Sequence, residues 1–143
     1  MPIGYSTGSE IGVSEMSHTF FIDRCLTGHR FRSALSRAGL RVESLEFHLP
    51  SNCDDLTWLP LVSAPPFEWV IITKDNSILS NPYEFDAICE YRARMILFPD
   101  QDLSATEMAD RFLHYLSDIL TALDTRGSPL IIVLHKNRIE IGP

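Results

Sequence analysis

Apolar and polar residues alternate along the chain in a pattern that predicts short buried strands separated by helices. The continuous apolar runs TFFI and WVIIT are typical of strands that are covered on both faces of a sheet. Similar runs occur near the C-terminus, where the last two predicted strands are close enough to form a hairpin. The predicted strands are residues 19–23, 41–47, 68–73, 95–98, 130–134 and 138–141.

Apolar residues at helical spacing occupy the segments between these strands, and each segment carries a start or stop signal. Gly39 ends the first helix, Pro82 opens the third, and Ser104 with Glu107 has the spacing of a capping box. The predicted helices are residues 29–38, 54–63 and 81–91, followed by one long helix that starts at Ser104 and is ended by Gly127. Strands that alternate with helices predict an α/β fold, a three-layer sandwich with a mostly parallel central sheet.

Composition adds limits to this picture. A chain of 143 residues is the size of one domain, and we expect a disordered leader over residues 1–17 and the domain over residues 18–143. The net charge of -7 argues against a protein that coats nucleic acid without specificity, but not against an enzyme with one local binding patch. The chain has no membrane-length apolar run or secretory signal, and its three cysteines lack zinc spacing, which predicts a cytoplasmic protein.

Carboxylates occupy the positions where an α/β sheet binds ligands, in the crevice outside the carboxyl ends of its strands. Asp23 and Asp75 each follow an apolar strand, and two predicted helices could bring Asp55 and Glu84 to the same crevice. Oxygen ligands suit Mg²⁺ or Mn²⁺, and such a cluster is a device for metal-assisted hydrolysis of phosphodiesters. The alternative is structural, because Asp is also common at helix starts, where it caps the backbone.

Three segments also resemble a known family. Residues 20–24 (FFIDR), 55–60 (DLTWLP) and 69–75 (WVIITKD) resemble PIN-like nucleases, in the branch that includes VapC-type toxin ribonucleases. The resemblance implies a PIN-like fold and a Mg²⁺- or Mn²⁺-dependent endoribonuclease, the toxin of a type II toxin–antitoxin system. It also implies that Asp23, Asp55 and Asp75 bind the metal and that Glu84 completes the catalytic set.

Basic residues near these acids are candidates for binding the RNA substrate. Arg24 and Lys74 each adjoin a predicted site acid, and Arg30 lies at the start of the first predicted helix, where the helix dipole favours phosphate. For Arg32 and Arg37 we expect a solvated helix face instead.

Partners and alternatives complete the sequence-based hypothesis. A toxin implies a cognate antitoxin protein, and PIN-like proteins often form homodimers. One alternative is a PIN-like binding module without catalysis. The other is a receiver-like phosphoacceptor domain, which places acids near its first strand and a lysine after its fifth, where Lys136 is available.

Overall fold

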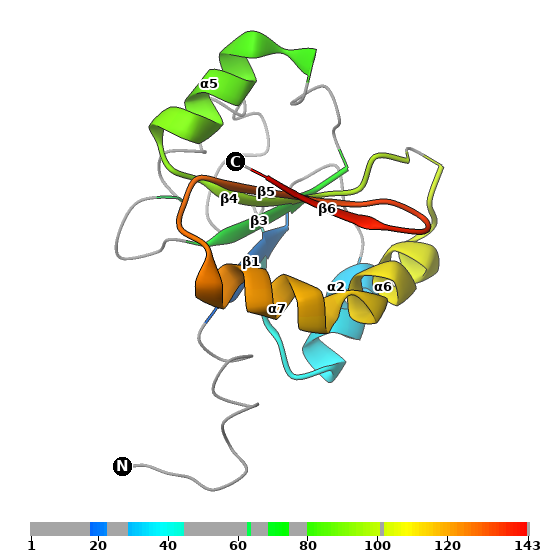
Figure 1. The fold of residues 1–143 in the computed structure, drawn as a ribbon. Helices are drawn as coiled ribbons and strands as arrows, with labels where there is room; N and C mark the ends of the chain where they lie inside the picture. The colour runs from blue at the N-terminus through cyan, green and yellow to red at the C-terminus, as the bar shows by residue number, and fades with distance from the viewer. Residues whose placement is uncertain are drawn as a thin grey trace, which may run out of the picture.

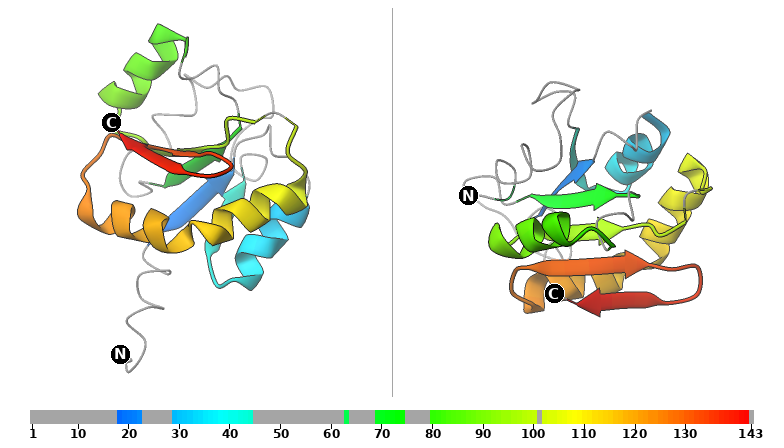
Figure 2. Two further views of the ribbon diagram at one scale, coloured as in Figure 1. Left: turned by 45° about the vertical axis from the view of Figure 1, so that its right-hand side comes forward. Right: turned by 90° about the horizontal axis from the view of Figure 1, so that it is seen from above.

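The computed structural model describes residues 18–22, 29–44, 63, 69–74, 80–100 and 102–142, and these form a six-stranded sheet between two helical layers (Figure 1). The strand order is β2-β1-β3-β4-β5-β6, parallel throughout except for the antiparallel β5–β6 hairpin (Figure 2). The strands are β1 (Thr19–Ile22), β2 (Arg41–Ser44), β3 (Val70–Thr73), β4 (Arg94–Leu97), β5 (Leu130–Leu134) and β6 (Ile139–Gly142). The predicted three-layer α/β fold is therefore confirmed.

Helices cover both faces of the sheet. α5 (Pro82–Glu90) lies on one face, while α2 (His29–Arg37), α6 (Ala105–His114) and α7 (Leu116–Thr125) lie on the other (Figure 1). The chain moves from β1 to β2 in one direction along the sheet and from β3 to β4 in the other. Because these two crossovers are right-handed, α2 and α5 lie on opposite faces. The crossover from β4 to β5 has the other hand, since α6 and α7 lie on the face of α2 although the chain moves in the same direction as from β3 to β4. No helix in the described ranges is long and apolar enough to cross a bilayer.

Each face of the sheet has its own hydrophobic core. Phe20 on β1 points to the layer of three helices, where its ring meets Phe112 edge-on at 5.5 Å between centroids. Phe112 also meets Phe31 of α2 edge-on at 6.2 Å. The next residue of β1, Phe21, points to the other face and stacks on Trp69 at 5.5 Å. Trp69 is thus packed against the core of this face.

The helix boundaries follow the signals in the sequence. The Ser104 hydroxyl accepts a hydrogen bond from the Glu107 N–H at 3.1 Å, and the Glu107 carboxylate accepts one from the Ser104 N–H at 2.9 Å, which completes the capping box. The Asn81 side chain accepts a hydrogen bond from the Tyr83 N–H at 2.9 Å at the start of α5. Gly39, with φ 92°, ends α2 in the left-handed region that favours glycine.

The prediction of one long helix after Ser104 is wrong. α6 and α7 are separate helices that meet at Tyr115, whose φ of -97° and ψ of 8° leave the helical region. The Tyr115 ring is buried, and its hydroxyl donates to the His135 carbonyl oxygen at 3.4 Å. Both helices pack on the same face of the sheet, so the apolar pattern continues through the break and gives no sign of it.

Several predictions fall on residues outside the described ranges. These are the leader over residues 1–17 and the helix over residues 54–63, of which the structure describes Ser63 alone, as helical.

Candidate functional site

The candidate site lies where β1 and β3 end, because the chain adds strands on opposite sides of β1 before and after this point. β1 has β2 on one side and β3 on the other, so the chain leaves β1 and later returns to pair with its opposite edge. Ile22, the last residue of β1, is in register with Ile72 of β3. In open α/β sheets with this order, ligands bind outside the carboxyl ends of these two strands. The topology therefore marks the ends of β1 and β3 as the candidate site.

The predicted site acids follow these strand ends in sequence. Asp23 comes directly after Ile22, and Asp75 comes two residues after Thr73. Asp23, Asp55 and Asp75 themselves lie outside the described residues, as does Arg24. Glu84 belongs to the first turn of α5, which follows β3, but its side chain is not described. The structure thus describes the two strands that carry the acids, and the convergence of the acids stays a prediction.

In the described part of this edge, the Arg111 side chain connects α6 to the ends of two strands. This α6 side chain donates hydrogen bonds to Asp100 Oδ2 at 2.7 Å and to the Leu134 carbonyl oxygen at 3.0 Å, and only 11 % of it is exposed. Asp100 follows β4 and Leu134 ends β5, so one guanidinium joins α6 to the ends of two strands. This role of Arg111 was not predicted, although a basic residue three positions after the buried Met108 is unusual in the apolar stripe of a helix.

A second polar group lies just beyond β5. The His135 ring is paired with Glu140 of β6, with 2.9 Å between Nε2 and Oε1. This hydrogen bond, together with the nearby charge of Arg138, holds the pKa of Glu140 below its ordinary value. These contacts tie the hairpin together. Within the described ranges, no three His, Cys, Asp or Glu residues are arranged to hold a metal ion.

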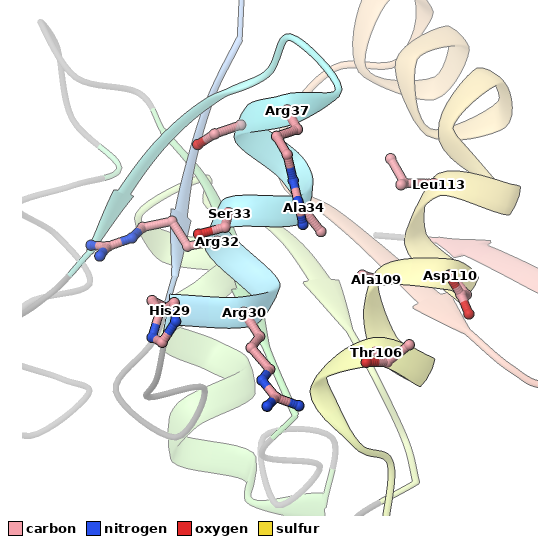
Figure 3. Close-up of a pocket in the computed structure, with 11 residues that line it drawn as sticks. His29, Arg30, Arg32, Ser33, Ala34, Arg37, Thr106, Ala109, Asp110 and Leu113 are labelled. Carbon is pink, nitrogen blue, oxygen red and sulfur yellow. The ribbon is translucent and has the colours of Figure 1, made fainter.

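Two of the predicted RNA-binding residues are described. Lys74 is half-buried and follows β3 directly, and Arg30 is exposed in the first turn of α2. Arg30 also lines a groove of about 760 Å³ between α2 and α6 (Figure 3). The groove was not predicted. Its lining residues are His29, Arg30, Arg32, Ser33, Ala34, Ser36 and Arg37 from α2, and Thr106, Ala109, Asp110 and Leu113 from α6.

Comparison with known proteins agrees with this architecture. A family described as "PIN like domain" matches residues 18–100, more than half of the chain, and the chain therefore belongs to the PIN-like domain family. Among curated proteins it is similar to one from Mycobacterium tuberculosis named "Putative ribonuclease VapC45". The two are 25 % identical over 131 residues, which cover 89 % of this chain and 92 % of that protein. No solved structure matches significantly. The resemblance to PIN-like nucleases of the VapC type is confirmed.

Proposed function

We propose that this protein is a metal-dependent endoribonuclease and the toxin of a type II toxin–antitoxin system. The observation that carries the proposal is the pairing of β1 with β3, because each of these neighbouring strands is followed within two residues by a predicted site acid. Membership of the PIN-like family and similarity to a protein named as a VapC ribonuclease support the same conclusion.

The chemistry of the donor set suits a hard divalent cation. Asp23, Asp55 and Asp75 offer only carboxylate oxygens, the ligands that Mg²⁺ and Mn²⁺ prefer, and we assign them as the metal ligands. Glu84 completes the catalytic set. When bound, the cation supplies a water of lowered pKa and balances charge on the phosphate.

The chain's own cations have a separate task, which is to hold the RNA. Arg24, Lys74 and Arg30 carry positive charge next to an acidic pocket that would otherwise repel phosphate. A guanidinium can hold a phosphate through two hydrogen bonds, which orients it, whereas an ammonium acts as a point charge. In this proposal Arg30 binds from the first turn of α2 and Lys74 from the end of β3.

Substitution of the strand-end acids tests the proposal. Asp23→Asn and Asp75→Asn keep the size of the side chain and remove its charge, so we expect at least about a hundredfold loss of RNA cleavage with Mg²⁺ or Mn²⁺. Asp118→Asn, on the exposed surface of α7, is the matched control and should cleave like the wild type. Cleavage that is unchanged in both strand-end variants, or absent from the wild type with either metal, would contradict the proposal.

The partners follow from the same proposal. A toxin needs a cognate antitoxin protein, and both the antitoxin and the RNA substrate place the protein in the cytoplasm. A homodimer is also proposed. The receiver-like alternative has no support from the family match. The PIN-like module without catalysis would be recognised by calorimetry that detects no Mn²⁺ binding.

A further inference from the structure

The groove between α2 and α6 is lined on one side by a basic helix, and one end of it faces the edge of the sheet that carries the candidate site. α2 holds three of the chain's twelve Lys and Arg residues within nine positions and has no acidic residue. This concentration is unusual in a chain with a net charge of -7. A local basic stripe on an acidic protein attracts a polyanion to that stripe and away from the rest of the surface.

The groove runs lengthwise between two helices that point the same way. α2 follows β1 and α6 follows β4, so both helices begin at the carboxyl edge of the parallel sheet. Figure 3 shows Arg30 and Thr106 at one end of the groove and Arg37 and Leu113 at the other. The end with Arg30 is therefore the end nearest the candidate site.

Three arginines on α2 line this groove, and two of them, Arg30 and Arg37, lie on the side of the helix that faces α6 (Figure 3). Arg30 and Arg37 are seven residues apart, so they lie on the same side of the helix and about 10 Å apart along its axis. Both are exposed and lie on the side of α2 that faces α6, whereas Arg32 points away from α6 (Figure 3). The hydroxyls of Ser33 and Thr106 add neutral groups that can donate to phosphate.

We propose that this groove is a track for the RNA strand, in which Arg30 and Arg37 bind successive parts of the phosphate backbone as it leaves the candidate site. The inference rests on the proposed function, because RNA is the polyanion that this site would take. Asp110, on the α6 side of the groove, carries a negative charge that repels the RNA backbone. Removing charge from α2 should therefore weaken RNA binding, and removing it from Asp110 should strengthen RNA binding.

RNA binding without cleavage tests the track. The full-length protein is titrated in EDTA against a fluorescein-labelled, single-stranded oligouridylate, and the anisotropy is followed at several salt concentrations. One phosphate contact to a single strand contributes about 0.7 to the slope of log K against log salt. Arg37→Gln should therefore reduce the magnitude of that slope by about 0.7. The loss of affinity relative to the wild type should then be about fivefold larger at 0.1 M salt than at 1 M salt.

Two further variants make the test specific. Asp110→Asn should strengthen binding, because it removes the opposing charge from the groove. Arg126→Gln, which makes the same charge change as Arg37→Gln at the exposed end of α7, should bind like the wild type. An unchanged slope in Arg37→Gln, or an equal loss in Arg126→Gln, would overturn the track and leave the groove for another ligand, such as an acidic protein segment.

The two proposals can fail separately. Loss of cleavage in Asp75→Asn with an unchanged salt slope in Arg37→Gln would keep the ribonuclease and remove the track. A wild type that does not cleave, together with a reduced slope in Arg37→Gln, would keep the track and remove the ribonuclease.

Discussion

Replacing Arg111 by Met tests whether one guanidinium holds the carboxyl edge of the sheet together. Met keeps most of the apolar stem that packs beneath the guanidinium, so the change removes mainly the charge and the hydrogen bonds. The bonds at stake are those to Asp100 Oδ2 and to the Leu134 carbonyl oxygen. Asp100→Asn is the partner variant, because it weakens only the first of them.

The expected cost follows from the exposure of each partner. The Asp100 side chain is 53 % exposed, so its ion pair with Arg111 should contribute about 0.5–1 kcal/mol. The bond to the Leu134 carbonyl comes from a guanidinium that is 11 % exposed and is charge-assisted, which gives about 1.5–2 kcal/mol. Arg111→Met should therefore cost about 2–3 kcal/mol of unfolding free energy, and Asp100→Asn about 0.5–1 kcal/mol.

Urea unfolding of the wild type, both single variants and the double variant gives the comparison. A loss of this size should lower the midpoint by roughly 1–2 M without changing the slope m. The double-mutant cycle should return a coupling of about 0.5–1 kcal/mol for the ion pair. An Arg111→Met protein that is no less stable than Asp100→Asn would refute the assigned role of the Leu134 bond.

The other predictions concern helix ends, backbone conformation and the core. The hydrogen bonds with Ser104 lower the pKa of Glu107 below its ordinary value of 4.5. The stability that the Glu107 carboxylate adds is therefore fully present above pH 4.5 and is lost as the pH falls through the lowered pKa. The stability difference between wild type and Glu107→Gln, measured by urea unfolding at several acid pH values, should shrink in that range, and a constant difference would be inconsistent with the cap. Gly39→Ala should lower the free energy of unfolding by about 1 kcal/mol, because φ is 92° at this position. Arg92→Gly should raise it by up to about 1 kcal/mol, because Arg92 has a φ of 56° that glycine adopts without strain. Thermal melts that shift in the opposite directions would disprove both. Phe112→Ala should cost about 3–5 kcal/mol in chemical denaturation because the ring is fully buried, and a cost below about 1 kcal/mol would show that the site refills.

The sequence predicted elements best where local chemistry decides them. β3 and β5 are continuous apolar runs with every residue buried, and the capping box at Ser104 forms both of its hydrogen bonds. The break at Tyr115 was missed because α6 and α7 both turn apolar residues to the same face of the sheet. The helical periodicity of the sequence therefore continues through the break.

The same limit applies to the site. The sequence placed candidate acids after two strands, but only the register of Ile22 with Ile72 shows that those strands end side by side. The spacing of Arg30 and Arg37 is visible in the sequence. Their groove is not, because its other wall is α6, about seventy residues further along the chain. For this reason a solvated helix face was the expected environment of Arg37.

Cleavage of RNA by the purified protein is the decisive experiment for the proposed ribonuclease function. The measurement is the single-turnover rate of cleavage of one labelled RNA with saturating Mn²⁺, for the wild type and for Asp75→Asn. Circular dichroism checks that both proteins are folded. We expect that the wild type cleaves the RNA, that EDTA stops the cleavage, and that Asp75→Asn is slower by at least about a hundredfold. Equal rates for the two proteins, or cleavage that persists in EDTA, would contradict the proposed function.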